Sequence, residues 1–281
     1  MKIKILSDST CDLSKELLEK YDITLVPLTV IKNGDAFKDG VDITPAEIFA
    51  HVAAGGDLCS TTAMNVGEYE EYFEKYSSEY EGVLHINIGS KFSSSYQNAC
   101  IAAEDYPNVR VVDSMNLSTG QGLVVLKACE LAQNCESLDA LFEEVQAFTA
   151  KIEASFLLDQ LNYMVKGGRC SSVVALGANL LNLKPCIEVK DGKLSVVKKY
   201  RGNYVKCLAT YVKERLADRD DLDNGTLFVT RTPVTEECEN AVKGALDLYA
   251  KDFENIYWTE AGCTVSCHCG PGTLGVLFVR K

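Results

Sequence analysis

The chain has little positive charge and little histidine, and it contains no long hydrophobic run. Its 28 Lys and Arg residues are outnumbered by 40 Asp and Glu residues, which gives a formal net charge of −12. A protein without a basic stripe cannot neutralise a phosphate backbone, so we expect neither nucleic acid nor an anionic membrane surface as a partner. An anionic ligand would have to be held by a local group of donors.

Segments that direct a chain to or across a membrane are also missing. No apolar run reaches the roughly 18 residues of a membrane span, and no charged segment followed by an apolar stretch indicates export. We therefore expect a cytoplasmic protein with no stable membrane insertion. The twelve cysteines are then expected to be free thiols. Cys263, Cys267, His268 and Cys269 lack the paired Cys-x-x-Cys spacing of zinc sites, so no metal site is predicted.

The common nucleotide and hydrolase motifs are absent. Gly270, Gly272 and Gly275 have the G-x-G-x-x-G spacing, but a strand follows them where dinucleotide binding requires a helix. The chain has no Walker loop and no G-x-S-x-G nucleophile elbow. We predict no cofactor.

The alternation of strand and helix patterns predicts an α/β protein with two lobes and a ligand between them. The first lobe, residues 1–150, is expected to hold a mostly parallel sheet with helices on both faces. The second, residues 151–281, is expected to be an α/β lobe with a mixed or antiparallel sheet. A helix is expected from Glu143 onwards, and Asp191-Gly192 predicts a hairpin turn.

Polar turns follow three of the predicted strands, at residues 7–10, 89–95 and 113–119. The carboxyl ends of parallel strands meet at one edge of a sheet, where ligands of such sheets bind. In the second turn Ser93, Ser94 and Ser95 precede a predicted helix, whose free N–H groups favour a carboxylate or phosphate. One serine would suffice to cap that helix, so the run exceeds what capping needs.

Three cationic or titratable residues have both a structural and a functional interpretation. Arg169 follows a Gly-Gly pair and could face an anion or cap carbonyl groups of the other lobe. His268 lies among small residues, where a backbone can approach a ligand closely. Arg201 follows a Lys-Lys pair, which indicates either a solvated hairpin edge or a docking contact.

These sequence features, in this order, resemble the DegV family of bacterial fatty-acid-binding proteins. The matching segments cover essentially the whole chain: SDSTCDL at 7–13, STTAMNVGEY at 60–69, SKFSSSYQNA at 90–99, VVDSMNLSTGQGLVV at 111–125, KGGRCS at 166–171, NLKP at 182–185, KKYRG at 198–202 and HCGPGTLGV at 268–276. The resemblance implies a long-chain fatty acid buried between two lobes, with its carboxylate held by hydroxyls from two loops. It also implies a carrier that catalyses no reaction alone and presents the acid to an ATP-dependent fatty acid kinase, for acyl phosphate formation in phospholipid metabolism.

The resemblance assigns roles to particular positions. The expected carboxylate ligands are Thr61, Thr62, Ser93, Ser94, Arg169 and His268, and Arg201 is the expected kinase contact. The expected walls of the acyl tunnel are Phe92, Met115, Leu157, Leu161, Met164, Leu176, Leu180 and Leu181. The chain departs from the family's usual Thr-Ser-Gln-Pro-Ser loop at residues 61–65, and Ser94 replaces a usual glycine.

Two alternatives stay open at this point. One is a hydrolase or transferase with Ser93 as nucleophile and His268 as base, although the missing elbow and orienting carboxylate count against it. The other is a carrier of a different anionic amphiphile with no kinase partner. Both use the same site, so the identity of the ligand would separate the second from the fatty-acid carrier.

Overall fold

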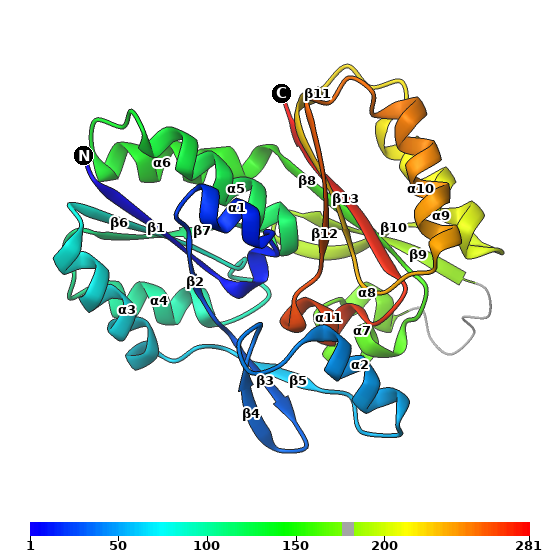
Figure 1. The fold of residues 1–281 in the computed structure, drawn as a ribbon, viewed down its shortest axis with the longest axis horizontal. Helices are drawn as coiled ribbons and strands as arrows, with labels where there is room; N and C mark the ends of the chain where they lie inside the picture. The colour runs from blue at the N-terminus through cyan, green and yellow to red at the C-terminus, as the bar shows by residue number, and fades with distance from the viewer. Residues whose placement is uncertain (176–182) are drawn as a thin grey trace.

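The computed structural model of the protein describes residues 1–175 and 183–281. It is an α/β fold with three sheets: a parallel sheet in the N-terminal half, a mixed sheet in the C-terminal half and a small antiparallel sheet below them (Figure 1). The predicted fold class is thus confirmed, and the small third sheet is an addition that the sequence patterns did not reveal.

The parallel sheet has four strands with helices on both faces. Its strands, in spatial order, are β2 (Thr24–Val26), β1 (Ile3–Asp8), β6 (Gly82–Asn87) and β7 (Val109–Asp113). One face is covered by α3 (Val66–Glu79) and α4 (Ser95–Ala103), and the other by α1 (Lys15–Lys20), α5 (Ser118–Ala132) and α6 (Leu138–Phe148) (Figure 1). All pairings are parallel, so the three predicted polar turns do meet at one edge of the sheet.

The mixed sheet has six strands. In spatial order they are β10 (Lys193–Arg201), β9 (Leu183–Lys190), β8 (Ile152–Leu158), β13 (Thr273–Arg280), β11 (Leu222–Arg231) and β12 (Asn255–Glu260). Only β11 and β12 run parallel to each other. Helices α9 (Tyr204–Leu216) and α10 (Glu236–Tyr249) cover the face away from the first lobe (Figure 1). The predicted hairpin turn at Asp191-Gly192 joins β9 to β10.

The prediction of a helix from Glu143 onwards is wrong after Phe148. Helix α6 ends at Phe148, a 3-10 turn follows at Thr149–Lys151, and residues Ile152–Leu158 form strand β8 inside the mixed sheet. This strand is buried on both faces, and its residues Ile152 to Phe156 alternate between apolar and polar, which is a strand signal that the helix prediction overlooked. Leu157 and Leu158 then break the alternation, and so short a pattern does not exclude a helix by itself.

The segment DITLVPLTVI, residues 22–31, predicts a single strand, but the structure divides it between two sheets. Strand β2 ends at Val26, and β3 (Thr29–Lys32) joins β4 (Asp35–Lys38) and β5 (Ser60–Thr62) in the small antiparallel sheet. Pro27 separates β2 from β3, and proline has no N–H group for a sheet ladder. The break places Leu28 at the boundary between the sheets.

The small sheet connects the first half of the chain to the last helix. Helix α2 (Pro45–Ala53) begins with Thr44 in a capping box, as its Thr-Pro start predicts. Val30 and Ile48 pack in one buried cluster with Cys263 and Cys267 of α11 (Cys263–Cys269). Two short helices, α7 (Asn162–Gly167) and α8 (Ser171–Val174), pack against each other, and α7 also packs against α11. Helix α11 is therefore held between the lobes.

The two sheets share a core around α5. Leu123 and Val124 of α5 lie in the same buried cluster as Ile5 of β1 and as Phe228 and Leu277 of the mixed sheet. All strands of the parallel sheet precede residue 114 and all strands of the mixed sheet follow residue 151, while the division into lobes 1–150 and 151–281 stays a prediction. The shared cluster means that these lobes are packed against each other through apolar side chains.

Candidate functional site

A cleft between the lobes encloses about 630 Å³ of empty space, part of it open to solvent. The cleft is lined by residues of the small and mixed sheets, of the turns after β6 and β7, and of α7 and α11: Leu28, Thr61, Thr62, Ala63, Ile88, Phe92, Ser93, Leu117, Phe156, Met164, Arg169, Leu194, Thr264, Val265, His268 and Cys269. Ten of these residues are apolar and six are polar, and none has an acidic side chain.

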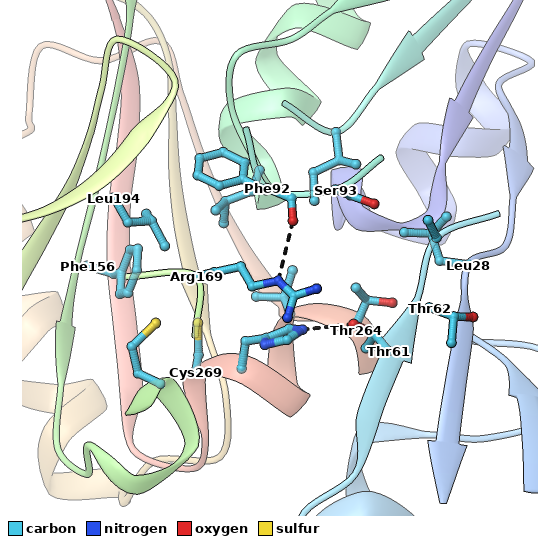
Figure 2. Close-up of a pocket in the computed structure, with 16 residues that line it drawn as sticks. Leu28, Thr61, Thr62, Phe92, Ser93, Phe156, Arg169, Leu194, Thr264 and Cys269 are labelled. Atoms are coloured by element: carbon cyan, nitrogen blue, oxygen red, sulfur yellow. Dashed lines mark hydrogen bonds between the residues drawn. The ribbon is translucent and has the colours of Figure 1, made fainter. Parts of the chain in front are cut away.

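Thr61 and His268 come from opposite ends of the chain and meet in this cleft. Thr61 Oγ1 lies 2.8 Å from His268 Nε2, which joins β5 to α11 (Figure 2). The other ring nitrogen, Nδ1, is buried without a hydrogen-bond partner in the described structure. Gly167 permits this packing, because a Cβ atom there would lie 2.4 Å from His268 Nδ1. Thr62, the next residue of β5, lines the cleft but is more exposed.

His268 is a neutral side chain at neutral pH. Burial lowers the pKa of its imidazole to about 4, and the nearby positive charge of Arg169 acts in the same direction. A neutral imidazole can donate to the Thr61 hydroxyl or accept from it. When it donates, the Thr61 proton is free to point at a ligand.

Ser93 lies in the turn between β6 and α4, as predicted. Its Oγ atom accepts a hydrogen bond from Ser95 N at 3.2 Å and lies 2.9 Å from Ser95 Oγ. Ser93 therefore satisfies one free donor of the α4 N-terminus, as the capping interpretation requires, and can still direct its own proton into the cleft. Ser94 is the N-cap residue of α4, makes no side-chain cap hydrogen bond, is exposed and does not line the cleft.

Arg169 crosses from the second lobe to the serine turn. Its Nε donates to Phe92 O at 3.4 Å, and its Nη1 donates to Gly167 O at 2.8 Å (Figure 2). Arg169 thus binds one carbonyl group of the first lobe, that of Phe92, and it also lines the cleft, whereas its contact with an anion stays a prediction. The guanidinium is exposed, so this end of the cleft reaches the molecular surface.

A set of buried carboxylates holds α11 against the first lobe, and sequence reasoning missed its role. Asp39 accepts from Cys263 N at 2.8 Å and from Thr264 N at 3.1 Å, while Asp12 accepts from Gly262 N at 2.9 Å. Burial raises the pKa of Asp12 to about 8. These bonds fix the start of the helix whose later turn carries His268.

The predicted tunnel residues divide into several groups. Phe92 and Met164 line the cleft. Leu157 and Leu161 are buried in core clusters but are not among the lining residues, and Met115 lines a different cavity. Leu176, Leu180 and Leu181 lie outside the described residues. Arg201 is exposed at the end of β10.

Several lining residues gave no signal in the sequence. Leu28, Leu117, Phe156 and Leu194 are ordinary apolar residues whose position depends on tertiary packing. Thr264 could have been found, because it lies four residues before His268 in a short helix and therefore on the same helix face.

A second cavity of about 400 Å³ extends the apolar space. It shares four lining residues with the cleft, namely Leu117, Phe156, Val265 and Cys269. Beyond them it is lined largely by small and apolar residues of the mixed sheet, with Thr230, Thr232 and Arg231 among its polar members. The two cavities adjoin at these four shared residues, and Thr61, Ser93, Arg169 and His268 lie in the first.

The described residues lack two features, a membrane-spanning helix and a metal-binding cluster. No helix there is long and apolar enough to cross a membrane. In the same part of the chain, no group of three or more His, Cys, Asp or Glu side chains could hold a metal ion. The twelve cysteines, all within the described ranges, are unpaired.

The fold and the cleft define a two-lobed α/β protein with an internal apolar space and a group of donors in one part of it. The chain belongs to the DegV family, since the family model described as "Uncharacterised protein, DegV family" matches residues 2–281. A DegV domain-containing protein of Caldanaerobacter subterraneus subspecies tengcongensis is 32% identical over 284 residues, which cover 100% of this chain and 99% of that protein.

Solved structures of family members are similar over their whole length. A DegV family protein from Thermus thermophilus, described with its fatty acid binding, has a TM-score of 0.89 and 28% identity, with 100% of both chains covered. A stearic-acid-binding protein from Eubacterium ventriosum has a TM-score of 0.80 and 30% identity, with 99% of this chain and 98% of that chain covered. Structurally similar members of the family thus bind fatty acids.

Proposed function

We propose that this protein binds one long-chain fatty acid, with the carboxylate beside Thr61, Ser93, Arg169 and His268. The observation that carries the proposal is the distribution of polarity in the cleft: hydroxyls, a guanidinium and a neutral imidazole gather together, the remaining lining is mostly apolar, and no acid lines it. A carboxylate satisfies such donors, whereas a cationic ligand would meet the charge of Arg169.

The apolar space suits the acyl chain. Each buried methylene contributes about 0.8 kcal/mol, so a long chain supplies most of the binding free energy while a few donors fix the head. The lining continues past Phe156 and Val265 into the second cavity, which is also largely apolar. Affinity would come from the tail and orientation from the hydroxyls.

The proposal extends to presentation of the acid to a separate ATP-dependent fatty acid kinase. Arg169 is exposed while His268 is largely buried, so a bound carboxylate would lie near the surface with its tail inside. Arg201 is exposed on the edge strand β10, which also carries the lining residue Leu194. A partner docked at Arg201 would contact the lobe that also provides part of the cleft lining.

An enzyme that uses Ser93 as nucleophile has less support. The hydroxyl of Ser93 lies beside Ser95, whereas His268 Nε2 lies beside Thr61. Nucleophilic catalysis by serine needs a base within hydrogen-bond reach and a group that orients that base. In the described structure His268 Nδ1 has no such partner.

The test of fatty-acid binding is mass spectrometry of solvent extracts from freshly purified protein, followed by titration of the stripped protein with palmitate and oleate. We expect a stoichiometric long-chain acid. Ser93→Ala with Thr61→Val should weaken binding at least tenfold, because hydrogen bonds to a charged group are lost. Ser90→Ala removes an exposed serine hydroxyl of the same turn and should bind as the wild type does. A clean extract with no uptake of either acid would refute the proposal.

The kinase step is tested separately. Loaded protein is mixed with ATP and a purified fatty acid kinase from the same organism, and ADP release is followed. Arg201→Glu should slow the reaction at least tenfold without changing fatty-acid affinity. Lys193→Glu makes the same charge change at the exposed start of β10 and should have a small effect. Equal rates for both variants and the wild type would remove Arg201 from the docking surface.

A further inference from the structure

Thr264 has a buried hydroxyl with no partner in the described structure. The residue is 6% exposed, lies in the first turn of α11 and lines the cleft. Its backbone N–H is bound to Asp39, yet its Oγ1 atom makes no hydrogen bond. Buried hydroxyls in folded proteins are almost always paired, so an unpaired one inside a cavity points to a partner that the protein itself does not provide.

The position of Thr264 relates it to the other donors. It precedes His268 by four residues, and residues four apart in a helix lie on one face. His268 bonds Thr61, so Thr264, His268 and Thr61 belong to one wall of the cleft. Helix α11 packs against β5, and Figure 2 draws Thr264 and Thr61 in the same part of the cleft.

The residues around Thr264 indicate what the missing partner is. No Asp, Glu, Asn or Gln side chain lines the cleft. The other polar lining groups are hydroxyls, a guanidinium and the imidazole, of which Arg169 can only donate. A ligand that satisfies Thr264 in this setting is therefore an acceptor, and it carries negative charge.

We propose that Thr264 is a third hydroxyl donor to the carboxylate of the bound acid, together with Thr61 and Ser93. This inference rests on the proposed fatty-acid binding and adds to it a ligand-binding residue from α11. The three hydroxyls come from three different parts of the chain, so the carboxylate would be enclosed by β5, by the turn before α4 and by α11. Asp39 would position Thr264 through its backbone N–H.

The test compares Thr264→Val, which keeps the side-chain shape and removes the hydroxyl, with Thr264→Ser, which keeps the hydroxyl. Dissociation constants are measured for laurate, palmitate and stearate with stripped protein. Thr264→Val should weaken binding of all three by about 10- to 100-fold, a range expected for loss of a hydrogen bond to a charged group. Thr264→Ser should stay within about threefold of the wild type.

Stability without ligand provides a second measurement. Removal of an unpaired buried hydroxyl should leave the stripped Thr264→Val protein at least as thermally stable as the stripped wild type, whereas added palmitate should stabilise the variant less. A variant that unfolds earlier without ligand and binds palmitate normally would show a structural hydroxyl and overturn the inference.

The outcomes separate this inference from the proposed function. If the wild type and Thr264→Val bind the acids equally well, the inference about Thr264 is overturned but the proposed function is not. Water would then be the partner of the Thr264 hydroxyl. A wild type that takes up none of the three acids would overturn the proposed function and this inference with it.

Discussion

His268 connects the geometry of the site to the pH dependence of folding. Its imidazole is neutral in the folded protein because burial lowers its pKa to about 4, while in an unfolded chain the pKa is about 6.5. Between these two values the unfolded chain binds a proton that the folded chain does not. The free energy of unfolding therefore falls as the pH drops through this window.

We expect this loss to amount to on the order of 3 kcal/mol by pH 4. Urea unfolding of the wild type and of His268→Gln at pH 7.5, 5.5 and 4.5 measures it, and the variant should lose less stability on acidification. Burial also lowers the pKa of His85, to about 3, but His85 is present in both proteins and its contribution cancels in the comparison. If the free energy of unfolding depends on pH in the same way for both proteins, the lowered pKa of His268 is not the cause of the loss.

At this scale the sequence identified the polar residues better than the apolar ones. Ser93, Arg169 and His268 stand out by residue type and by their neighbours in sequence, and the resemblance adds Thr61. The apolar wall could not be found in the same way, because Leu117 or Phe156 differs from any other core residue only by where the fold places it. Ser94 was expected to bind the ligand because it lies beside Ser93 in sequence. Its side chain is instead exposed at the helix cap, which its residue type did not reveal.

At the scale of elements, α11 depends on the carboxylate of Asp39. This side chain accepts hydrogen bonds from two backbone N–H groups of α11 and from Ser9 Oγ at 3.0 Å. Asp39→Ala would leave these donors buried and unpaired. We expect a loss of about 2–4 kcal/mol in the free energy of unfolding.

Hydrogen exchange locates that effect. In Asp39→Ala the amides of Cys263 and Thr264 should exchange faster than in the wild type, and fatty-acid binding should weaken because α11 carries two of the proposed ligands. Asp42→Ala removes a nearby exposed carboxylate that accepts from Lys38 N, and it serves as the matched control. Equal exchange in both variants would show that α11 is held by its apolar contacts alone.

Elements with local signals were predicted, and elements defined by their neighbours were not. The Thr44-Pro45 start of α2 and the Asp191-Gly192 turn are determined by a few adjacent residues, so the sequence specifies them directly. Strand β8 alternates over only five residues before Leu157 and Leu158, which is too short a pattern to exclude a helix, and the small sheet exists because Pro27 ends one ladder and allows β3 to enter another. Both depend on contacts with residues far away in the chain.

At the scale of the whole molecule, we propose that the lobes 1–150 and 151–281 unfold together. The cluster around α5 contains Ile5 of the first lobe and Phe228 and Leu277 of the second, so neither lobe retains a complete core alone. The only tryptophan, Trp258 on β12, reports on the second lobe, and hydrogen exchange of β1 amides reports on the first.

The two probes should give coincident transitions in urea. Leu277→Ala should lower the free energy of unfolding by about 2–5 kcal/mol and shift both transitions equally, because the side chain is buried in the shared cluster. Val41→Ala, at an exposed position, is the control. Transitions that separate, or a shift confined to Trp258, would show two independent lobes.

The order of strands in the mixed sheet has a consequence for how the protein is made. Strand β13 follows every other strand of that sheet in the chain, yet it lies between β8 and β11 in its interior. A nascent chain on the ribosome therefore lacks a central strand until residues 273–280 have emerged from the exit tunnel, and α11 has no finished sheet beside it before then. The wall of the cleft that α11 provides is therefore complete only after this strand has joined the sheet.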